Sequence, residues 1–286
     1  MIRIAMILTA CLLMPLTVSA VEWADVPAGP FLMGSTPAQV EQGYRISAAG
    51  YGHDRVRQSH WFDDEAPQRQ VNLPAYRIMT TPVTQAEYAV FIQQSGHPAP
   101  FVDADTWASY GLIEPYADVM PLLWHDGKMP EGMANHPVVL VSYADARAYA
   151  AWLSKRSGRS LRLPSEAEWE KAMRGVDGRL YPWGNAYDAA RLNDAARKLH
   201  ASMPVGALPD GASPYGVLDG AGQVFEWTTT PWSGDDGKMT VKGGSWDDYG
   251  GVCRVAAHHE RPRMQKHFLI GFRLMEDLTS TGLGSR

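Results

Sequence analysis

The sequence predicts a compact, loop-rich domain in which a few helices and short strands are joined by many turns. The chain contains 27 glycines and 20 prolines, two residue types that mark turns and interrupt regular structure. Its apolar runs are short, and its aromatic residues are spread evenly along the chain. These observations argue against a helical bundle. Because the sequence shows no internal repeat and no low-complexity linker, we expect a single domain over residues 21–286.

Three segments carry the signature of a helix start. In each, a hydroxyl side chain is followed three residues later by a carboxylate, and the two can bond reciprocally to free backbone N–H groups. A glycine closes each segment, as is typical of a helix end. The predicted helices run from Thr84 to Gly96, from Ser142 to Gly158 and from Ser165 to Gly175.

Two short apolar runs lead into the second and third helices and are predicted to be strands. They read HPVVLVS over residues 136–142 and SLRLPS over residues 160–165. Short apolar runs next to turn signals are consistent with buried strands. Residues 36–62 show no comparable pattern, and we expect them to form a loop within the domain.

Residues 1–20 are predicted to be a cleavable secretory signal. Arg3 precedes an apolar run that stops at Pro15, and Val18-Ser19-Ala20 provides a cleavage site of small residues. The run is too short to span a bilayer stably, so we expect no integral membrane segment after cleavage. The expected location is the periplasm.

The charge of the chain indicates which partners are not expected, and its cysteine content indicates which disulfides it can form. The chain has 26 basic and 31 acidic residues and no basic run, so nucleic acid is not an expected partner. Its two cysteines are Cys11, inside the predicted signal, and Cys253. The mature chain can therefore form no internal disulfide, and a buried, inert Cys253 is favoured over a reactive one.

Five ordered blocks of the chain resemble the formylglycine-generating, or sulfatase-modifying, enzymes. The first two blocks are FLMGS and DEAPQRQVNLPAYRIMTTPVTQAEYAVF. The third is HPVVLVSYADARAYAAWLSKRSGRSLRLPSEAEWEKAMRG, with YPWGN just after it. The last two are PYGVLDGAGQVFEW and the GGSWDD to IGFRL region. The resemblance implies an α+β fold of the C-type-lectin-like type with much irregular structure. Most of the matched tryptophans and glycines are expected to pack the core and to form turns.

The chain departs from this family at its copper site. In the family, two cysteines of a GGSYxCHxSYC run hold a copper ion, and soft Cu(I) favours such thiolate ligands. Here Asp248 stands where the first thiol is expected, and Cys253 is the remaining thiol. No copper dithiolate site is therefore expected.

The resemblance also implies a structural calcium ion. The residues at the corresponding places are Asn193, Asp194, Gln223 and Glu226, with Gln223 in place of a family asparagine. Calcium takes six or more oxygen ligands, several of them anionic. The alternative is that these side chains bond to the backbone, as most buried polar groups do.

The AAHHERPR segment offers a candidate for acid–base chemistry. Alternation along a strand would place His258 and Glu260 on one face and His259 and Arg261 on the other. A carboxylate beside an imidazole raises the imidazole pKa, and the pair can pass protons near neutral pH. We predict Glu260 as the catalytic base and His258 or His259 as its relay. The alternative is a solvated hairpin with weak surface ion pairs.

The loop before this segment is expected to bind substrate, because in the family it lines the substrate groove. Trp246 and Tyr249 would stack on a flat ring, with Asp247 and Asp248 beside them. Arg261 or Arg263 would meet anionic groups of the substrate.

The chain resembles the periplasmic branch of the family that matures the siderophore pyoverdine. That resemblance implies oxidation of dihydropyoverdine to pyoverdine, with the siderophore precursor as partner and other periplasmic maturation enzymes nearby. Dioxygen is the expected electron acceptor, because the sequence has no flavin or nicotinamide motif. One alternative is metal-dependent modification of a secreted protein or peptide, with His258, His259 and an aspartate as ligands. Another is a non-catalytic, lectin-like binding module.

Overall fold

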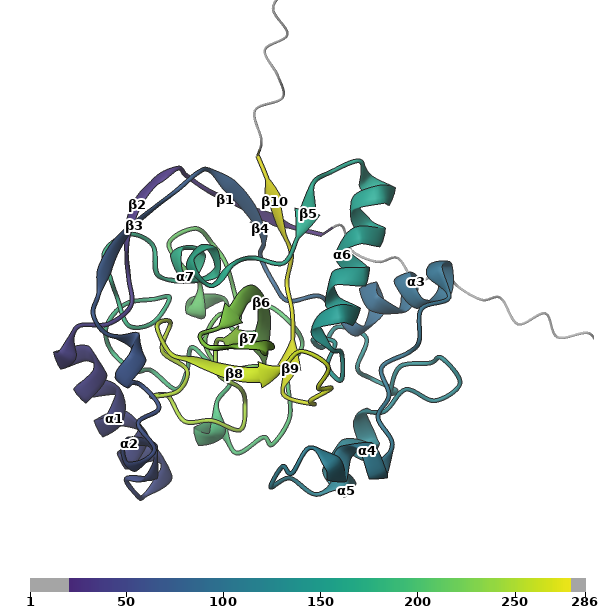
Figure 1. The fold of residues 1–286 in the computed structure, drawn as a ribbon, viewed down its shortest axis with the longest axis horizontal. Coiled ribbons are helices and arrows are strands. Elements are labelled where there is room, and N and C mark those ends of the chain that lie inside the picture. Colours follow the sequence, from purple (N-terminus) through teal and green to yellow (C-terminus); the bar gives the residue numbers. More distant parts are fainter. Residues whose placement is uncertain (1–20, 279–286) are drawn as a thin grey trace, which may run out of the picture.

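The computed structural model describes residues 21–278 as three small sheets with helices around them (Figure 1). The predicted signal, residues 1–20, lies outside the described residues. Over the described range, no helix combines the length and apolar character needed to cross a membrane. The α+β class with much irregular structure, expected from the sequence, is confirmed.

The first sheet brings the two ends of the described chain together. Its strands are antiparallel and lie in the order β1 (Trp23–Val26), β4 (Tyr76–Met79), β10 (Met275–Asp277) and β5 (Leu161–Arg162). A second sheet pairs β2 (Gly29–Met33) with β3 (Arg69–Leu73).

The third sheet carries the candidate site. Its order is β8 (His258–Pro262), β7 (Asp235–Lys242), β6 (Phe225–Trp232) and β9 (Ile270–Gly271). Strands β6, β7 and β8 are antiparallel, and β9 runs parallel to β6. In Figure 1, β8 crosses the middle of the molecule, with α1 (Pro37–Tyr51) and α2 (Arg55–Gln58) on one side. The helices α4 (Ala104–Ser109) and α5 (Tyr116–Val119) lie on the other.

The three predicted helices are confirmed as α3 (Gln85–Ser95), α6 (Tyr143–Ser157) and α7 (Glu166–Arg174). Each begins with the expected capping box, and a glycine follows each of them. The remaining short turns of helix are η1 (Asp63–Glu65), η2 (Met120–Leu122), η3 (Ala195–Arg197) and η4 (Pro209–Gly211).

The loop predicted over residues 36–62 is wrong, because most of that segment is helical. Thr36 caps α1 with a capping box to Gln39, and Gly52 closes the helix in the left-handed conformation. The helix buries Gly43, Tyr44 and Ser47, which do not form an apolar stripe. A Cβ on Gly43 would lie 2.3 Å from the guanidinium carbon of Arg254, so only glycine allows this close approach.

The strand predicted over residues 136–142 is also wrong. The apolar residues of this run are buried in the main core, but the segment is irregular, with a single bridge at Pro137. Leu140 has a φ of 59°, which breaks the extended conformation. The other predicted run forms the two-residue strand β5.

Candidate active site

Strand β8, at the edge of its sheet, lines a pocket of about 420 Å³ with residues from both of its faces. Its walls come from four separate parts of the chain, which explains why the sequence alone did not reveal most of them. The aromatic walls are Trp61, before η1, and Phe225 and Trp232 of β6. The polar side chains are Ser59, His60, Asp64, Asp248, His258, His259, Glu260 and Arg261.

His258 is held in a partly buried ionic cluster at the edge of this pocket. Its Nδ1 lies 2.6 Å from Glu166 Oε1, and its Nε2 lies 3.0 Å from Asp64 Oδ1. Burial lowers the pKa of His258, but the two carboxylates outweigh burial and raise the pKa to about 9. The protonated ring therefore joins β8 to α7 and η1, which is a structural role.

Glu260, the base predicted from the sequence, lies at the exposed rim of the pocket. Its Oε1 is 2.8 Å from Lys238 Nζ on the neighbouring strand, and its side chain is 42% exposed. The carboxylate is therefore held by an ion pair near solvent and away from the aromatic walls of the pocket. The predicted alternation along β8 is confirmed, because His259 and Arg261 both contact Phe225 on the opposite face.

His259 lies deeper in the pocket, with its ring edge against Trp61 and Phe225 at centroid distances of 4.9 and 5.4 Å. Burial lowers its pKa to about 3, and the charges of Arg261, His258 and Lys242 act in the same direction. The ring is neutral at physiological pH. A neutral imidazole can donate one hydrogen bond and accept another.

Asp248 is the carboxylate of the 245–249 loop that lines this pocket. Burial raises its pKa to about 6, and the charge of Asp247 adds to the effect. Its orientation is fixed by the Ser245 hydroxyl and backbone N–H, which donate to Oδ2 at 2.5 and 3.1 Å. The Tyr51 hydroxyl of α1 donates to Oδ1 at 3.2 Å. This combination is suited to accept a proton.

Arg261 is a cation without a carboxylate partner among residues 21–278. Its Nη1 donates to the Glu260 carbonyl at 2.7 Å, its Nε is buried and unbonded, and its guanidinium lies over the Phe225 ring. Burial lowers its pKa, but an arginine remains charged in proteins. The pocket therefore offers a partly dehydrated positive charge to an anionic ligand.

The structure separates the other predicted substrate residues from this pocket. Trp246 and Asp247 line a different pocket of about 460 Å³. Tyr249 packs edge-on against Tyr51 at 4.8 Å and does not line the first pocket. Arg263 is exposed and follows the end of β8, where its backbone bonds to Gly237 and Tyr143.

The residues present do not fit the copper site of the family. Cys253 is free and buried, and burial raises the pKa of its thiol well above the usual value. The nearest polar partners of its Sγ are the carbonyls of Ser245 and Asp248, at 3.9 and 4.0 Å. A single protonated thiol cannot supply a dithiolate.

The four side chains predicted to bind calcium do not form a calcium site, because most of their oxygens are already engaged in hydrogen bonds. Glu226 receives both nitrogens of the Arg273 fork, and Asp194 accepts from the Tyr187 hydroxyl. Asn193 donates to Gln223 Oε1, which leaves Asn193 Oδ1 as the unbonded buried oxygen among these side chains. One free oxygen is far fewer than calcium requires.

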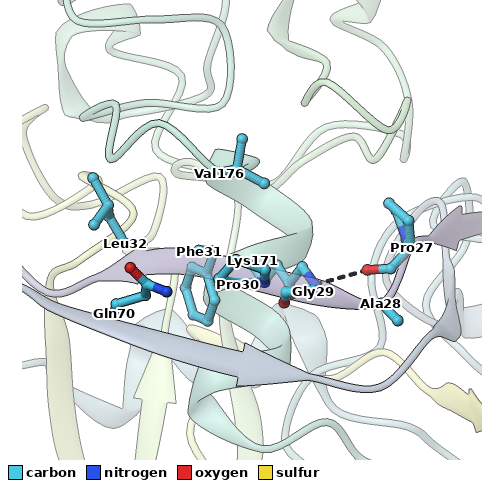
Figure 2. Close-up of a pocket in the computed structure, with 9 residues that line it drawn as sticks. All are labelled: Pro27, Ala28, Gly29, Pro30, Phe31, Leu32, Gln70, Lys171 and Val176. Atoms are coloured by element: carbon cyan, nitrogen blue, oxygen red, sulfur yellow. Dashed lines mark hydrogen bonds between the residues drawn. The ribbon is translucent and has the colours of Figure 1, made fainter.

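A third pocket, also of about 420 Å³, lies beside β2 and α7, and Figure 2 shows its lining. Its walls are mostly apolar, and its charged group is the buried Lys171. The ammonium donates to the carbonyls of Pro27 and Gly29 at 2.7 and 2.8 Å. Lys171 therefore ties α7 to the β1–β2 turn, and we assign this pocket no chemistry.

Comparisons with known proteins agree on one family. The family described as "Sulfatase-modifying factor enzyme 1-like domain" matches residues 13–278. The "Hercynine oxygenase" of Mycolicibacterium smegmatis is 30% identical over 88% of this chain, and the match spans 60% of its own length. The "Inactive C-alpha-formylglycine-generating enzyme 2" of Bos taurus is 32% identical over 65% of this chain and 70% of its own.

The fold also matches a solved structure. PvdO from Pseudomonas aeruginosa superimposes with a TM-score of 0.69 over 90% of this chain and 94% of that one, at 24% identity. At that identity the likeness concerns the fold alone.

Proposed function

The chain belongs to the sulfatase-modifying factor enzyme 1-like family, and on that premise we propose that it oxidises a flat ring in a secreted siderophore precursor, dihydropyoverdine. The observation that carries this proposal is the β8 pocket. It places a carboxylate with a near-neutral pKa, a neutral imidazole and an unpaired guanidinium between aromatic walls.

Each part of the pocket has a proposed role in this reaction. Trp61 and Trp232 would hold the flat ring between them. Arg261 would pair with an anionic oxygen of the ring or its neighbour, because a bound anion would satisfy its buried Nε. His259 would bond to a ring hydroxyl or nitrogen.

Asp248 would act as the general base. Conversion of dihydropyoverdine to pyoverdine removes two electrons and two protons, and a new double bond cannot form until one ring proton leaves. A base works best when its pKa lies near the working pH, which suits Asp248. Glu260 is instead held in an ion pair with Lys238 at the exposed rim. The proposed reaction therefore assigns the role of base to a different carboxylate from the one predicted by the sequence.

Dioxygen is the proposed electron acceptor. One dioxygen molecule would take up the two electrons and two protons and leave as hydrogen peroxide, which balances the reaction. The resemblance to a relative named as an oxygenase supports the use of dioxygen in this family.

The test is to mix the purified protein with dihydropyoverdine in air and to follow the absorbance of the mature chromophore and the hydrogen peroxide formed. The proposal expects equal amounts of both, and no product without dioxygen. If the chromophore appears no faster than in a protein-free control, the proposal fails.

A non-catalytic binding module is the second candidate, because one relative carries the name of an inactive enzyme. This candidate expects the precursor to bind without turnover. If the protein is such a module, Asp248→Asn should change only its affinity for the precursor.

The periplasm is the proposed location. Cleavage after Ala20 would release a chain that begins at Val21. Mass spectrometry of the N-terminus of exported protein tests this, and a retained residue 1–20 segment would contradict it.

A further inference from the structure

The pocket that contains Trp246 and Asp247 lies on the other side of the 245–249 loop from the β8 pocket. Asp248 lines the β8 pocket and Asp247 lines the second one, so adjacent residues of one loop face different spaces. The charge of Glu114, in the second pocket, raises the pKa of Arg261, in the first, and so opposes the effect of burial on that guanidinium. The two pockets are therefore neighbours.

The second pocket is strongly acidic and has an apolar floor. Its carboxylates are Glu114, Asp118 and Asp247, and the imidazole of His200 is the one basic side chain among the described residues that line it. Its apolar wall includes the rings of Trp246 and Phe268, whose centroids are 5.8 Å apart. Aromatic faces and carboxylates both attract cations.

Glu114 shows that this acidity is not satisfied within the protein. Its Oε2 atom has no exposed surface and no hydrogen-bond partner among residues 21–278. A buried carboxylate oxygen without a partner is costly, and a ligand that donates a hydrogen bond would remove that cost. Burial also raises the pKa of Asp247, where the charge of His200 lowers it and that of Asp118 raises it.

We infer that this second pocket binds an alkylammonium group, such as a basic side chain with an apolar stem. The ammonium would bond to Glu114 and Asp247, and the stem would lie on Trp246 and Phe268. Resting on the proposed function, this pocket would hold a cationic arm of the substrate while its ring occupies the β8 pocket. The substrate would then have a flat, partly anionic part joined to a basic one.

The experiment is calorimetric titration of the full chain with 1,5-diaminopentane, with pentane-1,5-diol and glutarate as neutral and anionic probes of the same length. We expect the diamine alone to bind. Glu114→Gln and Asp247→Asn should each weaken it by about tenfold, the loss expected for one charged hydrogen bond. Asp25→Asn, at an exposed side chain of strand β1, should leave the affinity unchanged.

Equal binding of the diol, absence of diamine binding, or full affinity in both carboxylate variants would overturn the inference. Glu114→Gln keeps the shape of the side chain, and Asp247→Asn changes an exposed loop residue, so at least one variant should fold. Asp248→Asn separates the two proposals. If it abolishes oxidation but binds the diamine normally, both proposals stand. If the wild type binds the diamine yet does not oxidise dihydropyoverdine, only the proposed function fails.

Discussion

The wall of the β8 pocket depends on a buried ion pair between Glu65 and Arg254. Both nitrogens of the Arg254 fork donate to Glu65, at 2.7 and 2.8 Å, and both side chains are 0% exposed. Ser35 Oγ also donates to the Glu65 carboxylate at 2.7 Å. Because Glu65 ends η1 and Arg254 precedes β8, the pair joins the segment that carries Trp61 and Asp64 to the strand that carries the site.

Glu65→Gln would keep the shape of this side chain but leave the guanidinium of Arg254 buried and uncompensated. Removal of one partner from a buried pair costs about 3–5 kcal/mol. For a domain of this size, that loss corresponds to a fall in melting temperature of roughly 6–20 °C. The loss would be a large fraction of the 5–15 kcal/mol by which domains are typically stable.

The assay is urea unfolding of wild type and variant, followed by tryptophan fluorescence. Glu41→Gln is the matched control, since it breaks the exposed pair with Arg57 and should leave the midpoint unchanged. The double change Glu65→Leu with Arg254→Met should recover part of the loss, because no charge then remains buried. A Glu65→Gln midpoint equal to that of Glu41→Gln would refute this account of the wall.

Two further predictions concern His258 and Cys253. His258→Gln should lower the free energy of unfolding by up to about 3 kcal/mol, since the folded pKa of about 9 lies above the usual 6.5. That contribution is complete below pH 6.5 and is lost as the pH rises through 9. Urea unfolding across this range should therefore show the difference in free energy of unfolding between wild type and variant becoming smaller as the pH rises. A difference that grows with pH would contradict the assignment. Cys253 should react with iodoacetamide only after unfolding, because its thiol is buried and its pKa is raised, and rapid labelling of the native protein would show otherwise.

The helices were predictable where local chemistry alone determined them. Thr84, Ser142 and Ser165 form their capping boxes with residues three positions away, and tertiary contacts are not needed for that bond. Helix α1 carries the same signal at Thr36 and Gln39, but its buried face consists of Gly43, Tyr44 and Ser47 and gives no apolar stripe.

The site was predictable only where it, too, depends on local sequence. The alternation of residues 258–261 follows from the strand itself. The separation of Asp247 from Asp248 depends on the turn that the loop makes, and Trp61 and Trp232 reach the pocket from distant segments. Such contacts leave no local pattern. The apolar run over 136–142 was misjudged because burial does not distinguish a strand from a buried irregular segment.

The central claim is that Asp248 accepts a proton in the β8 pocket. The most direct test is the pH dependence of dihydropyoverdine oxidation by wild type, Asp248→Asn and Glu260→Gln. The wild-type rate should rise with pH as Asp248 loses its proton and should level off above about pH 6. Asp248→Asn should lose about 10²–10⁴-fold of this rate, whereas Glu260→Gln should keep most of it. Oxidation by Asp248→Asn at the wild-type rate would contradict the claim.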